Sequence, residues 1–155
     1  MPKPEFNTSR EEALKILKKG EYGVLCTASL DGQPYGVPLN YCYDSEKNCI
    51  YFHCAKTGLK LDRLIQNPKV SFVVVTRSDL VPAKLSTSYE SIIATGRAAV
   101  VVDDEEVLHA LVLLCEHLSP EMADKVANMN CLKHVCIVRV TIDEITGKSK
   151  DISSL

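Results

Sequence analysis

The chain has 155 residues, of which 46% are hydrophobic and 25% charged, a composition typical of a globular domain with a substantial core and not of a disordered chain. Eighteen Lys and Arg against twenty Asp and Glu give a formal charge of -2, and no basic block could neutralise a row of phosphates, so nucleic acid is not an expected partner. No apolar run approaches the ~20 residues of a membrane span, and the N-terminus lacks the apolar stretch of a signal peptide. We therefore expect a single domain over residues 1–155, located in the cytoplasm and not in a membrane.

The seven cysteines are odd in number, none has C-x2-C spacing, and several fall inside apolar strand patterns. Such residues behave as small buried hydrophobes in a reducing compartment. We predict no metal site.

The first expected element is a helix that begins after Ser9 and ends at Gly20. Glu12 lies three residues after Ser9, the spacing of a capping box, and glycine is the usual residue at a helix C-terminus. The apolar residues between them recur on one face, which predicts a helix packed against a core.

A β-hairpin is expected next, with arms over 22–30 and 33–44 joined at Asp31-Gly32, a pair that tolerates positive φ in a tight turn. In the second arm large apolar residues alternate with small or polar ones, so one face has room beside it. Pro38 lies on that face and cannot donate to a neighbouring strand. We expect the face to border an edge, a bulge or a ligand.

Four further strands are predicted, over 48–54, 69–76, 89–102 and 134–142, and the strand at 69–76 is apolar on both faces and is expected to be buried on both. A helix over 59–67 follows the third strand. After Asp103 a third helix is expected, and after Ser119-Pro120 a fourth, with Met122, Val126 and Met129 on its inner side. Six β segments with short helical inserts predict a mainly β fold with peripheral helices, an antiparallel barrel and not a βαβ sheet.

The stretch from Tyr51 to Pro68 contains the strongest candidate site. A strand ending at Cys54 passes Gly58 and enters a helix near Leu59, which presents unpaired N–H groups and the positive end of the helix dipole. Lys60 lies in the first helical turn, where a cation opposes the dipole, so a bound anion explains it better than helix stability does. The spacing is equally compatible with Lys56 and Lys60 being solvated surface charges.

His53 shares a strand face with Tyr51 and Cys49. A histidine at a strand end is usually a hydrogen-bonded structural residue, but it can also contact a ring or titrate near neutrality. His109 and His117 are expected to be exposed on their helix. No catalytic triad can be inferred from chain order, since triad residues meet only in space.

A second polar cluster precedes and enters the fifth strand, with hydroxyls at Ser86, Thr87, Ser88, Tyr89 and Ser91. These hydroxyls indicate either a polar loop or a set of hydrogen-bond donors and acceptors for the edge of a polar ring. Gly96, inside the same strand, allows a backbone or a ligand to come close.

In order, the Asp31-Gly32 hairpin and the segments VPLNY, IYFHCAKTGLKLDRLIQNPKVSF, STSYESIIATGRA and ITGKSK resemble the flavin-binding split-barrel superfamily that includes pyridoxamine 5'-phosphate oxidase. Within it they are most similar to the nitroimidazole-resistance branch. The resemblance runs from the first helix to Lys150 and implies a homodimer of six-stranded split barrels, with two flavin mononucleotides (FMN) in grooves between the subunits.

The resemblance also implies a site, position by position. The phosphate and ribityl end of the flavin would lie along His53, Cys54, Ala55, Lys56, Gly58 and Lys60. The isoalloxazine ring would lie along Pro38, Leu39, Asn40 and Tyr41, while Ser88, Tyr89 and Ser91 would approach from the partner chain and Lys148 would close the site. His53 matches the family histidine that contacts the cofactor, and it is the one candidate catalytic residue, as a proton donor.

Two functions remain open. The resemblance implies an FMN-dependent oxidoreductase that passes electrons from a reduced nicotinamide to a small acceptor such as a nitroaromatic. The C-terminal ITGKSKDISSL lacks the arginine and proline of authentic pyridoxamine phosphate oxidases, so that reaction is not expected. The alternative is a non-catalytic module that holds flavin, as FMN or FAD, or haem for sensing or storage.

Overall fold

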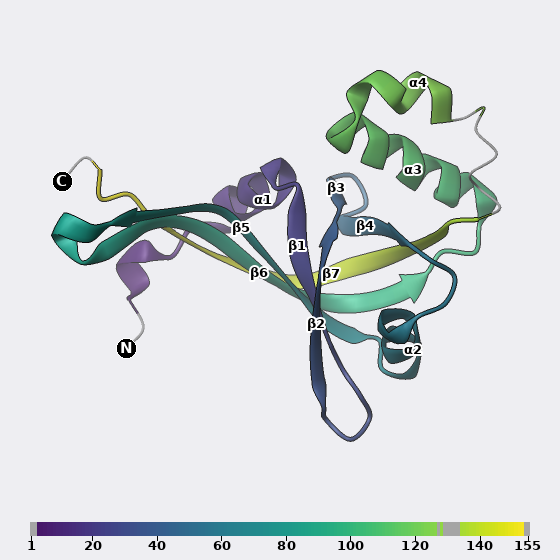
Figure 1. Ribbon diagram of the computed structural model, residues 1–155, viewed down its shortest axis with the longest axis horizontal. Helices are drawn as coiled ribbons and strands as arrows, with labels where there is room; N and C mark the ends of the chain where they lie inside the picture. The colour runs from purple at the N-terminus through teal and green to yellow at the C-terminus, as the bar shows by residue number, and fades with distance from the viewer. Residues whose placement is uncertain (1–2, 127, 129–133, 154–155) are drawn as a thin grey trace.

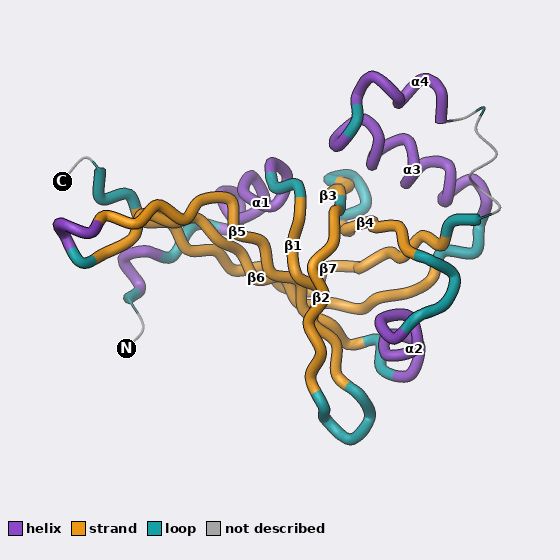
Figure 2. Tube along the Cα trace, viewed as in Figure 1, coloured by secondary structure: helices purple, strands orange, loops and turns teal. Residues whose placement is uncertain are grey.

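The computed structural model describes residues 3–126, 128 and 134–153, which form one curled antiparallel sheet with helices around it (Figures 1 and 2). The order in the sheet is β2-β1-β5-β6-β7-β4-β3. The strands are β1 (Tyr22–Ala28), β2 (Pro34–Asn40), β3 (Cys42–Asp44), β4 (Cys49–Cys54), β5 (Lys69–Val81), β6 (Ser86–Val100) and β7 (Cys136–Lys150). The helices are η1 (Pro4–Phe6), α1 (Arg10–Lys19), α2 (Leu59–Gln66), η2 (Pro82–Lys84), α3 (Asp104–Leu118), η3 (Pro120–Met122) and α4 (Ala123–Val126). The predicted mainly β split barrel is confirmed.

The described residues form seven strands and not six, because the predicted second arm of the hairpin divides at Tyr41. β2 pairs with β1, whereas β3 pairs with β4. Tyr41 turns into the core between them, and its hydroxyl donates to the Leu17 carbonyl of α1 at 2.5 Å. Since β2 and β3 end the strand order, the step through Tyr41 connects the two edges of the sheet and curls it into a barrel.

Several local predictions are confirmed atom by atom. The Ser9 N–H donates to Glu12 Oε2 at 2.9 Å and the Glu12 N–H to Ser9 Oγ at 3.2 Å, which completes the capping box of α1. In the β1–β2 hairpin, Gly32 has φ +90°, but Asp31 does not take positive φ. Pro38 lies on β2, an edge strand, as expected from its missing N–H.

The prediction that β5 is buried on both faces is wrong. Val70, Phe72 and Val74 are buried, but Val75 is exposed, because β5 runs on to Val81 and leaves the barrel with β6. We call the outer part of this pair, residues 75–93, the arm. It extends to one side in Figure 1, next to both described chain ends.

α3 packs on the outer face of the sheet, where Val107, Ala110, Leu111 and Leu114 form a second apolar cluster with strand residues. His109 and His117, expected to be exposed, instead contact the barrel: their Nε2 atoms lie 2.7 Å from Asp44 Oδ2 and 2.6 Å from the Gly20 carbonyl. Up to residue 126, the helix predicted after Ser119 takes the form of η3 and the short α4, with Val126 buried. Met129 lies outside the described residues.

No helix among residues 3–126, 128 and 134–153 is long and apolar enough to cross a membrane.

Candidate functional site

The strand–loop–helix from β4 to α2 has the geometry expected of an anion site. Gly58 is the N-cap of α2 with φ +142°, and no side chain caps this end of the helix. Only glycine adopts this backbone readily, and a Cβ at Gly58 would meet nothing within 4 Å, so the approach to the helix end is open. The first-turn N–H groups and the positive end of the helix dipole therefore point to an accessible loop.

Most of the predicted residues of this segment lie at the surface. His53, Ala55, Lys56 and Gly58 are exposed, and Lys60 is half-buried in the first turn of α2. Along the chain, His53, Lys56 and Lys60 all lie within five residues of Gly58, the uncapped start of α2. The combination suits a bound phosphate.

Cys54 differs from its neighbours, since its side chain belongs to the barrel core. Burial, and then the adjacent Cys136, raise the pKa of the Cys54 thiol to about 11, while the charge of Lys60 acts in the opposite direction. The sulfur therefore points into the barrel. Only the backbone of Cys54 borders the loop.

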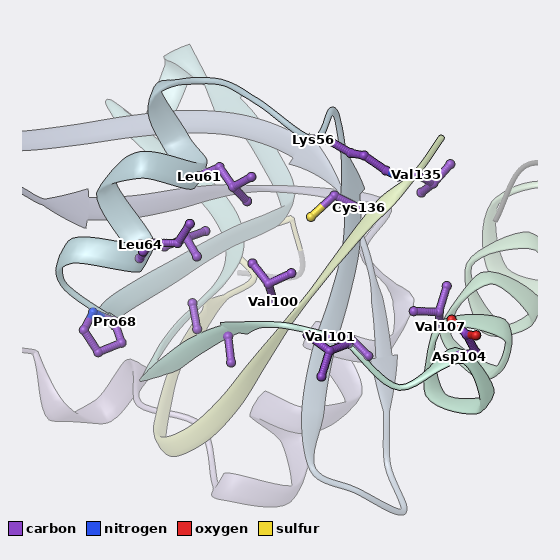
Figure 3. Close-up of a pocket in the computed structure, with 14 residues that line it drawn as sticks. Lys56, Leu61, Leu64, Pro68, Val100, Val101, Asp104, Val107, Val135 and Cys136 are labelled. Carbon is purple, nitrogen blue, oxygen red and sulfur yellow. The ribbon is translucent and has the colours of Figure 1, made fainter. Parts of the chain in front are cut away.

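A cavity of about 670 Å³ lies beside this segment, between α2, the end of β6 and the start of α3 (Figure 3). In the close-up, Leu61 and Leu64 of α2 lie on one side and Val107 and Asp104 of α3 on the other. The lining is mostly apolar and includes Lys56, Val100, Val101, Val135 and Cys136. No local sequence pattern indicated this cavity, because its walls come from three segments far apart in the chain, 56–68, 98–107 and 135–136.

The residues predicted to lie along the isoalloxazine ring, 38–41, are only partly accessible to a ligand. Pro38 and Asn40 are exposed, and the Asn40 side chain donates to the Glu21 carbonyl at 3.1 Å. Leu39 points the other way and packs against the barrel core. Tyr41 is fully buried, and burial raises its pKa well above the usual range, so its side chain is structural and offers a ligand no surface.

Ser88, Tyr89 and Ser91, the residues predicted to approach the flavin from the partner chain, lie on the arm. Ser88 is fully buried, and its hydroxyl accepts the Ile152 N–H at 3.0 Å, so this side chain fastens the C-terminal tail. Tyr89 and Ser91 are half-buried. Ser91 lies directly opposite Lys148 of β7, and the two line a cavity of about 440 Å³ with Asn7 and Thr8. The structure thus brings Ser91 and Lys148 together, a pairing that chain order alone did not reveal.

Within one chain, these arm residues lie far from the segment 53–60 at the start of α2. Ser88 lies ten residues along β6 from Ala98, which lines the α2 cavity. At ~3.3 Å per residue this is roughly 30 Å. Figure 1 likewise shows the arm and α2 at opposite ends of the molecule.

The curled antiparallel sheet, with α2 at one end and a projecting two-stranded arm at the other, defines the chain as a split β-barrel. A family model described as pyridoxamine 5'-phosphate oxidase matches residues 9–149, and the chain belongs to this family. No protein of curated function matches it in sequence.

Solved structures with the same fold include three informative examples. A candidate 5-nitroimidazole antibiotic resistance protein from Bacteroides thetaiotaomicron is 26% identical, with a TM-score of 0.74 over 90% of this chain and 83% of that one. A FAD-binding protein from Mesorhizobium loti is 24% identical, with a TM-score of 0.70 over 94% and 97%. A FAD and haem binding protein from Mycobacterium smegmatis is 17% identical, with a TM-score of 0.76 over 93% and 72%.

Proposed function

We propose that the protein binds FMN with its phosphate at the N-terminus of α2, and that it is an oxidoreductase passing electrons from a reduced nicotinamide to a small acceptor such as a nitroaromatic. The observation that carries the proposal is the open, uncapped helix end at Gly58 with Lys60 in its first turn. Membership of the pyridoxamine 5'-phosphate oxidase family and the 26% identical nitroimidazole-resistance relative support it.

Bound FMN would supply the redox chemistry, and the chain would bind and orient it. The N–H groups at the start of α2 and the Lys60 ammonium hold the phosphate, and Lys56 adds positive charge from the loop. Pro38 and Asn40 border the ring on the exposed face of β2. His53, exposed at the end of β4, donates a proton near the cofactor.

A complete site in this proposal needs two copies of the chain. Tyr89, Ser91 and Lys148 lie roughly 20–30 Å along the sheet from Ala98, which borders the α2 cavity, so in this proposal they reach a flavin there from a partner. The arm exposes apolar side chains that a partner would cover, namely Val75, Leu80, Leu85 and Ile93. Leu59, Ile65 and Val102 are exposed near α2 and its cavity. We expect a homodimer in which each arm completes the other subunit's site.

The second candidate is a non-catalytic module that stores or senses flavin or haem. The relative that binds both FAD and haem favours it, and the exposed imidazole of His53 is a ligand type that haem iron accepts. This second function uses the same fold and the same site but involves no catalysis.

The absorption spectrum of the purified protein, before and after anaerobic addition of NADH, separates the two functions. A flavin spectrum that bleaches with NADH and returns when a nitroaromatic is added supports the oxidoreductase. A flavin spectrum that NADH leaves unchanged supports the storage module, and a sharp Soret band supports haem. Failure to retain flavin or haem, even after incubation with each, would contradict both.

A further inference from the structure

Two cysteines lie opposite each other on neighbouring strands of the barrel. Cys54, the last residue of β4, lies directly opposite Cys136, the first residue of β7. Directly opposed residues of an antiparallel pair have Cα atoms about 4.5 or 5.5 Å apart, and both spacings fall within the range of roughly 4.4–6.8 Å that a disulfide spans. A bond between the two sulfurs therefore needs no movement of the strands.

The other described cysteines that lie on strands lack this arrangement. Cys42 lies opposite Tyr51, and Cys49 lies opposite Asp44, so these two cysteines are diagonal neighbours across β3 and β4. Diagonal positions are about 7–8 Å apart, too far for a disulfide without backbone movement. Cys26 lies opposite Gly36 and Ser71. Within the described residues, Cys54 and Cys136 are the directly opposed strand pair.

Small molecules have a route to this pair. Cys136 lines the 670 Å³ cavity, and Figure 3 shows its sulfur on the side of the strand that faces α2. Cys54 and Cys136 are each 8% exposed, whereas Cys42 and Cys49 are 2% and 1% exposed. The opposed pair therefore combines bonding geometry with access, and the diagonal pair has neither.

We propose that Cys54 and Cys136 form a reversible dithiol–disulfide site, oxidised by small peroxides that enter the cavity. One thiolate attacks the peroxide and becomes a sulfenic acid, with release of water when the peroxide is hydrogen peroxide. The second thiol displaces the sulfenic hydroxyl as water and forms the S–S bond. Two thiols and one hydrogen peroxide thus give one disulfide and two waters, and a small dithiol reverses the step.

The position of the bridge gives it a structural effect. Cys54 directly precedes the 55–58 loop, so a disulfide fixes the start of that loop to β7 in the cavity wall. Because burial raises the pKa of the Cys54 thiol, we expect its oxidation to be slower than that of an exposed, acidic cysteine. The inference does not depend on flavin binding.

The direct test is treatment of the reduced, folded protein with hydrogen peroxide, followed by alkylation and mass mapping without reductant. We expect the seven thiols to fall to five, with a mass loss of two hydrogens and a cross-link that dithiothreitol reverses. Trypsin leaves Cys49 and Cys54 together in peptide 48–56, so fragment ions must place the bridge on Cys54 and Cys136.

Serine variants of the two cysteines in peptide 48–56 give the control. Cys49→Ser leaves one cysteine in peptide 48–56 and should keep the cross-link to peptide 134–139. Cys54→Ser should abolish it. A cross-link from Cys49 or Cys42, or oxygen addition to single cysteines without a bridge, overturns the proposal. Because these results can be obtained on the wild-type protein alone, a misfolded variant does not remove the test.

Discussion

Lys60 is the residue on which the phosphate assignment depends most. It lies in the first turn of α2, where the helix dipole disfavours a cation, and no side chain caps this turn. Replacing Lys60 by alanine should weaken FMN binding by about 10- to 150-fold, the 1.5–3 kcal/mol expected of a hydrogen bond to a charged group. Titration of the apoprotein with FMN, followed by flavin fluorescence, measures this change.

Lys18→Ala is the matched control, since Lys18 is exposed in the last turn of α1, away from α2. It should bind FMN as the wild type does. Equal affinity of the Lys60 and Lys18 variants would return Lys60 to the class of solvated surface lysines.

Gly96 is a position where adding a single methyl group should lower the stability of the fold. A Cβ at Gly96 would lie 1.9 Å from the Thr141 carbonyl oxygen, at the register shift between β6 and β7. Gly96→Ala should lower the free energy of unfolding by about 1–3 kcal/mol, because backbone must shift to admit the methyl group. Urea denaturation measures it.

The comparison variant is Gly36→Ala on the exposed face of β2, where the nearest atom to a new Cβ is Val24 Cγ1 at 3.3 Å. Its unfolding free energy should change far less. If the two variants are equally stable, the close approach of β7 to Gly96 is not present in solution.

At the scale of elements, a polar cluster attaches α3 to the sheet. Glu106 Oε1 accepts hydrogen bonds from the Tyr51 hydroxyl at 2.8 Å and from Arg139 Nη1 at 2.5 Å. The hydrogen bond from Arg139 is the largest cause that holds the pKa of Glu106 below its usual value. A carboxyl with a lowered folded pKa contributes stability above its unfolded pKa, and this is lost as pH falls through the folded value.

Glu106→Gln should therefore destabilise the protein at pH 7, by about 1–2 kcal/mol, and should lose less further stability than the wild type between pH 7 and pH 3. Urea denaturation across this range gives both numbers. Glu116→Gln, on an exposed part of the same helix, should follow the wild type. A wild-type pH dependence in the Glu106 variant would contradict the role of this carboxylate.

The elements show what a single sequence can predict. The capping box of α1, the hairpin turn at Gly32 and the entry to α2 were predictable, because the residues that determine them lie within a few positions of one another. The division of β2 from β3 was not, since alternation continues through Tyr41 while the pairing partner changes from β1 to β4. The prediction that His109 is exposed was wrong because its partner, Asp44, lies 65 residues away in the chain.

The candidate site divides in the same way. His53 to Lys60 are contiguous, so their common surface could be predicted, whereas the burial of Tyr41 and Ser88 depends on Leu17 and Ile152, far along the chain. The pairing of Ser91 with Lys148 and of Cys54 with Cys136 requires the sheet register, which no local pattern carries.

At the scale of the whole molecule, the exposed apolar arm predicts a dimer. Leu80 is 79% exposed on β5, and a charge there should disfavour a partner surface. Leu80→Glu should shift the protein toward monomer and lower its flavin content, since the arm is expected to complete the partner's site. Sedimentation velocity, together with the flavin absorbance per chain, measures both effects.

Leu30→Glu is the control, because Leu30 is 77% exposed in the β1–β2 hairpin, outside the arm. It should leave the oligomeric state unchanged. A wild type that is monomeric at all concentrations, or a Leu80 variant that remains a dimer with full flavin, would argue against assembly through the arm.

If α2 holds a flavin phosphate, the apoprotein should distinguish FMN from riboflavin, and a comparison of its affinities for the two ligands measures this. The two ligands share the same ring and ribityl chain and differ by the phosphate alone. We expect the wild type to bind FMN at least tenfold more tightly than riboflavin, the ~1.4 kcal/mol of one decade, and we expect Lys60→Ala to reduce this difference in affinity. Equal affinity for FMN and riboflavin in the wild type would contradict this expectation.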